Sequence, residues 1–120
     1  MIVIKIKRVY EEANPSDGTR LLIERLRPRG MRKDSLPLDG WLKEAGPSMT
    51  LRKWFSHDPA KWDEFRRRYF AELQANPSVW RPITEAARRG TVTLIYSSHD
   101  EEHNNAVALQ EFLKRHIKRK

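Results

Sequence analysis

The sequence predicts an α/β fold: a single small domain over residues 1–120, with a three- to four-stranded, mostly parallel sheet flanked by about four to five helices. A chain of 120 residues has the size of one domain. Segments with the period of two that is typical of strands alternate with segments of helical spacing. One stretch, residues 91–97, carries no charge, which is typical of a central strand covered on both faces.

Three strands are predicted, two in the first third of the chain and one in the last third. Residues 2–9 alternate isoleucine with lysine, which indicates a strand with one wet face. Residues 20–26 form the second strand, which ends at Pro28. The uncharged residues 91–97 form the third. The direction in which the first two strands pair stays open, because their connection is short for a parallel crossover.

Helices are expected between the second and third strands and at the end of the chain. A short helix is predicted around residues 41–45, and another follows that either Ser48 or Thr50 can cap. The clearest helix follows Asp58-Pro59, an N-cap with proline at the first helical position. Further helices are expected over residues 78–89 and 101–117. The apolar stripe of the clearest helix consists of Trp62, Phe65, Tyr69 and Leu73.

Composition limits the compartment and the partners. The formal net charge is +8 and the pI is about 10.1, which favours anionic partners. The chain has no cysteine, so disulfides and thiol chemistry are excluded. No stretch approaches the ~20 apolar residues that cross a bilayer, and the amino terminus is too short for a signal peptide. We expect a soluble, cytoplasmic protein without a membrane partner; its oligomeric state is not predicted.

Several motifs together resemble one family. They are Lys7-Arg8-Val9-Tyr10, Asp17-Gly18-Thr19-Arg20, Arg25-Leu26-Arg27-Pro28-Arg29-Gly30, Trp41-Leu42-Lys43-Glu44, Leu51-Arg52-Lys53-Trp54-Phe55-Ser56-His57, Val92-Thr93-Leu94-Ile95-Tyr96-Ser97, Asp100 and His103-Asn104. This series resembles the short, YeaO-like branch of domain of unknown function 488. The resemblance implies no particular activity, because the family has no established one.

The turn after the uncharged strand is the first candidate site. Tyr96, Ser97, Asp100, His103 and Asn104 follow one another there. Ligands of open α/β sheets bind beyond the carboxyl ends of strands, which makes this turn a candidate for binding. The structural alternative is a capping box between Ser98 and Glu101 that starts the last helix.

A basic segment is the second candidate. It begins at Arg25 and ends at Lys33, and it also contains Arg27, Arg29 and Arg32. Arginine binds carboxylates and phosphates in a bidentate fork. The alternatives are a solvated loop, internal ion pairs, a small anionic ligand and a nucleic acid.

Secondary candidates come from the other motifs. They are Arg8, Asp17, Arg52 and His57. His99 and His103 are four residues apart, a spacing that can place two metal ligands on one helix face. The glutamate of the zincin motif is absent, however, and we predict no metal. The sequence contains neither a phosphate-binding loop nor a dinucleotide glycine pattern, and we predict no cofactor.

The sequence therefore predicts a small anionic ligand held between the Arg25–Lys33 segment and the turn after residues 91–97. Arg20 and Arg29 supply charge in this hypothesis, and the residues of the turn supply directional polar groups. The alternative is a nucleic-acid or protein interaction module that uses the same segment together with Arg66, Arg67 and Arg68. Whether the protein is an enzyme stays open.

Overall fold

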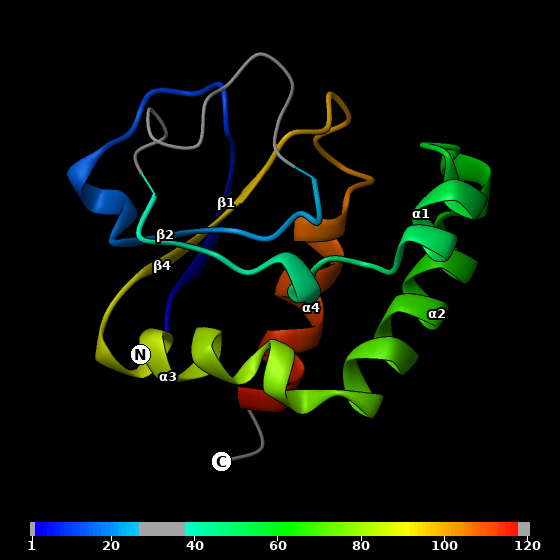
Figure 1. The fold of residues 1–120 in the computed structure, drawn as a ribbon. Helices are drawn as coiled ribbons and strands as arrows, with labels where there is room; N and C mark the ends of the chain where they lie inside the picture. Colours follow the sequence, from blue (N-terminus) through cyan, green and yellow to red (C-terminus); the bar gives the residue numbers. More distant parts are fainter. Residues whose placement is uncertain (1, 27–37, 118–120) are drawn as a thin grey trace.

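The sheet is four-stranded and parallel throughout. The computed structural model describes residues 2–26 and 38–117. The strands are β1 (Ile4–Arg8), β2 (Thr19–Leu22), β3 (Gly40–Trp41) and β4 (Val92–Tyr96), in the spatial order β1-β4-β2-β3. The predicted α/β class with a parallel sheet is confirmed (Figure 1).

The first two strands do not pair with each other. β4 lies between them and pairs in parallel with both. The connection over residues 9–18 contains no α-helix but a 3-10 turn (Pro15–Asp17), and it crosses the sheet on the face that carries Lys7 and Thr93. The question of their pairing direction is thereby answered: both run parallel to the strand between them.

β3 was not predicted. The expected helix around residues 41–45 is wrong in its first part, because Trp41 belongs to β3 and only Lys43–Ala45 form a single 3-10 turn. The Leu42 N–H donates to the Leu22 carbonyl, which continues the pairing with β2. A strand of two residues has no periodicity that a sequence can display.

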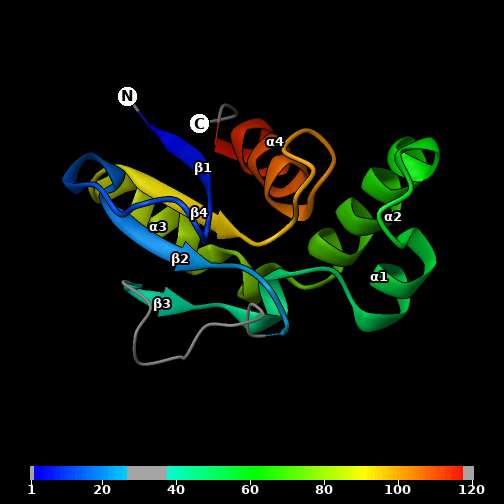
Figure 2. The same ribbon diagram turned by 90° about the horizontal axis from the view of Figure 1, so that it is seen from above.

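The described residues form four α-helices, which lie over and beside one face of this sheet. They are α1 (Met49–Phe55), α2 (Trp62–Ala75), α3 (Arg81–Arg89) and α4 (Asn105–Ile117). α4 contacts β1 and β4, and α3 contacts β4. α1 and α2 pack against each other, and α2 also packs against α4, beside the sheet (Figure 2).

β4 is the centre of the structure, as predicted. Leu94 and Ile95 have 0% of their surface exposed and belong to two different apolar clusters, one on each face of the sheet. Leu109 and Leu113 of α4 are buried in the same cluster as Leu94. The strand therefore joins the large helix-covered core to a smaller cluster on the opposite face.

The final helix begins later than predicted. The expected capping box of Ser98 and Glu101 does not form, and α4 starts at Asn105. The Asn104 side chain accepts the Val107 N–H at 3.0 Å and thus caps the helix. Residues 97–104 consequently connect β4 to α4, and residues 98–104 of this connection form a turn.

Candidate functional site

Three neighbouring strands end at one edge of the sheet. Arg8 of β1 lies opposite Tyr96 of β4, and Leu22 of β2 lies opposite Ile95. The segments that follow β2 and β4 must therefore leave the sheet side by side, which is the place where open parallel sheets bind ligands. We call this place the carboxyl edge.

Glu24 links the two segments. Its carboxylate accepts the Ser97 N–H at 2.9 Å and the Ser97 hydroxyl at 2.6 Å. Glu24 is only 8% exposed, and its carbonyl accepts the Trp41 indole N–H at 2.6 Å. The Ile23 carbonyl accepts the Asn105 amide, so that the start of α4 is also tied to β2. Glu24 and Ser97 thus fix the geometry of the carboxyl edge.

Glu24 was missed in the sequence. The signal that could have found it is a single acidic residue that directly follows the apolar run Leu21-Leu22-Ile23. A carboxylate at the end of such a strand must find hydrogen-bond donors if it is buried.

Asp100 organises the turn after β4. Its carboxylate accepts the N–H groups of Glu102 and His103, at 2.9 and 3.0 Å, and lies 3.0 Å from Nδ1 of the His103 ring. The Glu102 N–H is the main reason that the pKa of Asp100 lies below its usual value, and the His103 contacts add to the effect. The Asp100 carboxylate is therefore charged at neutral pH and has a partner at each of its two oxygens.

Two further candidates have structural roles at this edge. Asn104 is buried, caps α4 through its oxygen, and donates its amide to the Asp100 carbonyl at 2.9 Å. Tyr96 is buried in the large core. Burial raises the pKa of Tyr96, and the nearby carboxylates of Glu101 and Glu11 raise it further. The Tyr96 hydroxyl consequently stays protonated well above neutral pH.

Arg8 is held by the same turn. Its Nε donates to the Ser98 carbonyl at 2.8 Å, and its Nη2 lies 3.3 Å from the Nδ1 of His99. The guanidinium also lies 5.1 Å from the centre of the Tyr10 ring. Arg8 is thus a cation that a carbonyl, an imidazole and an aromatic ring hold at the end of β1.

Arg25 follows the other neighbouring strand. It is half-buried, and its Nε donates to the Pro47 carbonyl at 2.8 Å. Arg27, Arg29, Arg32 and Lys33 lie outside the described residues, and with them most of the predicted Arg25–Lys33 segment. The described part of the site therefore consists of Arg8, Arg25 and the turn after β4.

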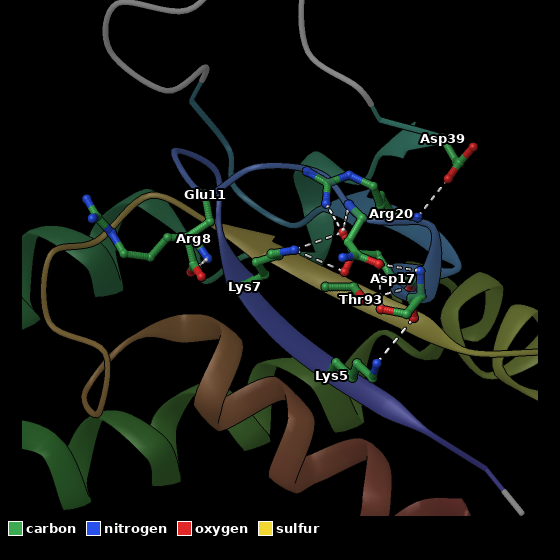
Figure 3. A network of polar contacts seen from close by, with 10 residues as sticks. Lys5, Lys7, Arg8, Glu11, Asp17, Arg20, Asp39 and Thr93 are labelled. Carbon is green, nitrogen blue, oxygen red and sulfur yellow. Dashed lines mark hydrogen bonds and ion pairs between the residues drawn. The ribbon is translucent and has the colours of Figure 1, made fainter.

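Arg20 belongs to a different network. It stands near the beginning of β2, where it pairs with Asp17, and Lys7 also donates to Asp17 at 3.1 Å (Figure 3). Thr93 donates its hydroxyl to the Asp17 carbonyl at 2.7 Å. This network lies on the face of the sheet opposite the helices, so the structure does not bring Arg20 together with Tyr96 and Asp100. The cause is the alternation of the strand: Arg20 points to the same face as Leu22.

The remaining secondary candidates lie on α1 and after it. Arg52 is in α1 and contacts the Met49 sulfur at 3.6 Å. His57 follows α1 with a φ of 58°, its side chain is exposed, and its ring centre is 6.4 Å from that of Phe55. Within the described residues, no hydrogen bond joins Arg52 or His57 to the turn after β4.

A groove of about 640 Å³ opens at the other end of the molecule. Its lining includes Ile2 and Ile4 of β1 and Lys114 and Ile117 of α4. These residues stand at the beginning of β1 and the end of α4, opposite Arg8 and the start of α4. The groove is therefore separate from the carboxyl edge.

The described residues contain neither a metal-binding cluster nor a membrane-spanning helix. Over residues 2–26 and 38–117, no group of three or more His, Cys, Asp or Glu side chains is arranged to hold a metal ion. In the same part of the chain, no helix has the length and apolar character needed to span a membrane.

The fold and its edge define a class of protein: an α/β domain with a four-stranded parallel sheet whose last strand runs into a polar turn without cysteine. A family model described as the inactive DUF488-N3 subclade matches residues 3–120. The chain belongs to this DUF488, YeaO-like family, and the resemblance seen in the motifs is confirmed.

Individual relatives cover nearly the whole chain. It is 40% identical over 111 residues to a protein named uncharacterized protein YeaO from Escherichia coli K12, which covers 92% of this chain and 96% of that protein. It is 34% identical over 110 residues to uncharacterized protein Rv3073c of Mycobacterium tuberculosis H37Rv, with 92% of each chain covered. No solved structure matches the chain significantly.

Proposed function

We propose that the protein is a binding domain without catalytic turnover, and that it holds a small anion at the carboxyl edge. The observation that carries the proposal is the Glu24–Ser97 contact, because it brings the segment that begins at Arg25 beside the turn after β4. The other neighbour of β4 ends in Arg8, which the same turn holds. Cations from both neighbouring strands thus flank the turn.

The acidic residues of the edge are compatible with an anion. Glu24 and Asp100 already accept hydrogen bonds from Ser97, Glu102 and His103. Hydrogen-bond donors to a carboxylate spread its negative charge. Arg8 and Arg25, in contrast, donate to uncharged carbonyl oxygens, and their positive charge can act on a ligand. The net charge of +8 attracts anions from a distance.

Two findings favour binding over catalysis. The matching family is described as an inactive subclade. Moreover, the hydroxyl of Ser97, which directly follows β4, donates to the buried Glu24 carboxylate rather than to a histidine. In the usual serine nucleophile the hydroxyl donates to a histidine that a third group orients, and Ser97 lacks this arrangement.

The nucleic-acid alternative has less support. Arg66, Arg67 and Arg68 would have supplied much of its basic surface. Arg66 pairs with Asp63 and Glu111, while Arg67 and Arg68 both pair with Glu64. Internal pairing lowers the number of phosphates that these side chains could neutralise.

The test is a thermal-shift screen with small anions at constant ionic strength. An anion that binds only the native state raises the midpoint. We expect a tetrahedral oxyanion to stabilise the wild type, and the Arg8→Gln and Arg25→Gln variants to lose most of this shift. Arg88→Gln is the matched control, because Arg88 is an exposed arginine at the end of α3. An equal response of all four proteins, or stabilisation by duplex DNA alone, would contradict the proposal.

A further inference from the structure

His103 has an unusually well-defined ring position for a half-buried side chain in a turn. Its Nδ1 lies 3.0 Å from the Asp100 carboxylate, and its ring meets that of Trp62 in α2 edge-on, with centres 5.3 Å apart and planes at 83°. Asp100 itself is fixed by two backbone N–H groups of the turn. The backbone N–H groups thus hold Asp100, and Asp100 and Trp62 together hold the His103 ring. The orientation of the imidazole is therefore set in the absence of a ligand.

This orientation determines what the other ring nitrogen can do. A carboxylate at Nδ1 requires the proton of the neutral ring to be there, which leaves Nε2 with a lone pair. Among the described residues, the hydrogen bonds of His103 use its backbone and Nδ1. The side chain is 31% exposed. Nε2 is therefore directed away from Asp100, and in the protonated ring it becomes a charged donor.

We propose that His103 binds the anion through Nε2 in its imidazolium form, so that binding at the carboxyl edge is coupled to the uptake of one proton. The inference rests on the proposed function and specifies it further. Arg8 and His103 both contact the same turn: Arg8 donates to the Ser98 carbonyl, and His103 lies against the Asp100 carboxylate. We infer a tetrahedral oxyanion of the phosphate or sulfate type, because it has more acceptor oxygens than a carboxylate for the N–H donors of Arg8, Arg25 and His103.

The charged surroundings are compatible with an imidazolium. Asp100 provides the counter-charge at 3.0 Å. The other titratable or charged groups on the elements packed around His103 are His99, Glu101 and Glu102 of the turn, His57 after α1, Asp63 and Arg66 of α2, and Glu111 of α4. Arg66 is the one cation of α2 next to Trp62, and Asp63 and Glu111 both pair with it. The charge of Arg66 is therefore balanced, and Arg8, which contacts Ser98 and His99 of the same turn, is the cation that would share the anion with the imidazolium.

The experiment follows the imidazole signals of all four histidines by NMR between pH 5 and 8. It compares sodium chloride with sodium sulfate at equal ionic strength; sulfate is the probe because its own charge is constant over this range. If the anion binds the imidazolium tenfold more tightly than the neutral ring, linkage raises the titration midpoint of His103 by about one pH unit at saturation. His116, at the far end of α4, is the internal control.

The variants make the result specific. We expect Arg8→Gln to abolish the sulfate-induced rise of the His103 midpoint. In His103→Gln, sulfate should still perturb the amide signals around Arg8, but its affinity should no longer depend on pH.

Each alternative outcome has one meaning. If sulfate perturbs the amides of Arg8 and Arg25 while the His103 midpoint stays unchanged, the anion site stands and the proton-linked contact is wrong. An equal rise at all four histidines would indicate general screening and would also overturn the inference. If no signal of the carboxyl edge responds to sulfate or phosphate, the proposed function fails and the inference falls with it.

Discussion

The Glu24 carboxylate accepts two hydrogen bonds from Ser97, one from the backbone N–H and one from the hydroxyl, and thereby joins the ends of β2 and β4. The two residues are 73 positions apart in the sequence. The contact closes the carboxyl edge of the sheet at the point where the basic segment begins. Glu24 therefore has a structural role, which can be tested separately from the ligand-binding role that we propose for Arg8 and Arg25.

Removal of the Glu24 carboxylate should destabilise the protein. In Glu24→Ala the Ser97 N–H and hydroxyl lose their acceptor in a half-buried position, and we expect the free energy of unfolding to fall by about 2–3 kcal/mol. Ser97→Ala removes one of the two bonds and should cost about 1 kcal/mol. Urea denaturation measures both, with the exposed Glu85→Ala as the control. If Glu24→Ala unfolds at the urea concentration of the control, the contact does not stabilise the edge.

β4 could be predicted from the sequence because its residues carry no charge and are bounded by Gly90 and a polar turn. β3 could not, because two residues have no periodicity. The start of α4 was ambiguous, since both Ser98 and Asn104 are good caps and only the three-dimensional path of the turn selects Asn104. Arg20 was misplaced because its position in the strand, not its charge, decides which face it occupies.

The candidate site was predictable only in outline. The rule that chemistry gathers at strand ends correctly brought the segment after residue 22 next to the turn after β4. The residue that makes the contact is nevertheless Glu24, which no motif singled out. Arg8 became relevant because β1 lies beside β4, and strand order cannot be read from three isolated strand patterns.

Leu94 should be among the most sensitive positions of the core. It is fully buried in the larger apolar cluster, so Leu94→Ala is expected to lower the free energy of unfolding by about 2–5 kcal/mol. Leu26→Ala is the matched control, since Leu26 is 51% exposed and should change stability by less than about 0.5 kcal/mol. Similar denaturation midpoints for the two variants would show that β4 is not central.

Asp17 should make stability depend on acid pH. Burial by itself raises the pKa of this carboxyl, but the Asn14 N–H and the charged side chains of Lys7 and Arg20 outweigh it, and the pKa of Asp17 lies below its usual value. A carboxyl with a lowered pKa in the folded state stabilises it above the unfolded pKa of about 4, and the contribution is lost as pH falls through the folded value.

Asp17→Asn tests this dependence. At pH 7 it leaves Lys7 and Arg20 without their counter-charge and should cost about 3 kcal/mol. The difference from the wild type should shrink as pH falls from about 5 to about 2, which urea titrations at several pH values would measure. Asp63→Asn is the control, because Asp63 is 91% exposed. A difference that stays constant over this range would refute the electrostatic role of Asp17.

Among the glycines of the described residues, Gly18 is the one whose replacement should be least tolerated. Its φ is 66°, and a Cβ atom there would lie 2.2 Å from the Thr91 carbonyl oxygen, which accepts the Thr19 N–H at the start of β2. Gly18→Ala should therefore cost about 3 kcal/mol. Gly90→Ala should be nearly neutral, because its φ of 172° is open to any residue and nothing lies within 4 Å of the added carbon. Thermal unfolding of the pair distinguishes the two positions.

The most direct test of the central claim is to map where a tetrahedral oxyanion binds, by following the backbone amide signals during a sulfate titration at constant ionic strength. The account predicts that the largest saturable changes occur at Arg8, at Arg25 and in the turn from Ser98 to His103. Changes concentrated instead at the groove between the beginning of β1 and the end of α4, around Ile4 and Lys114, would contradict it, and so would the absence of any saturable change.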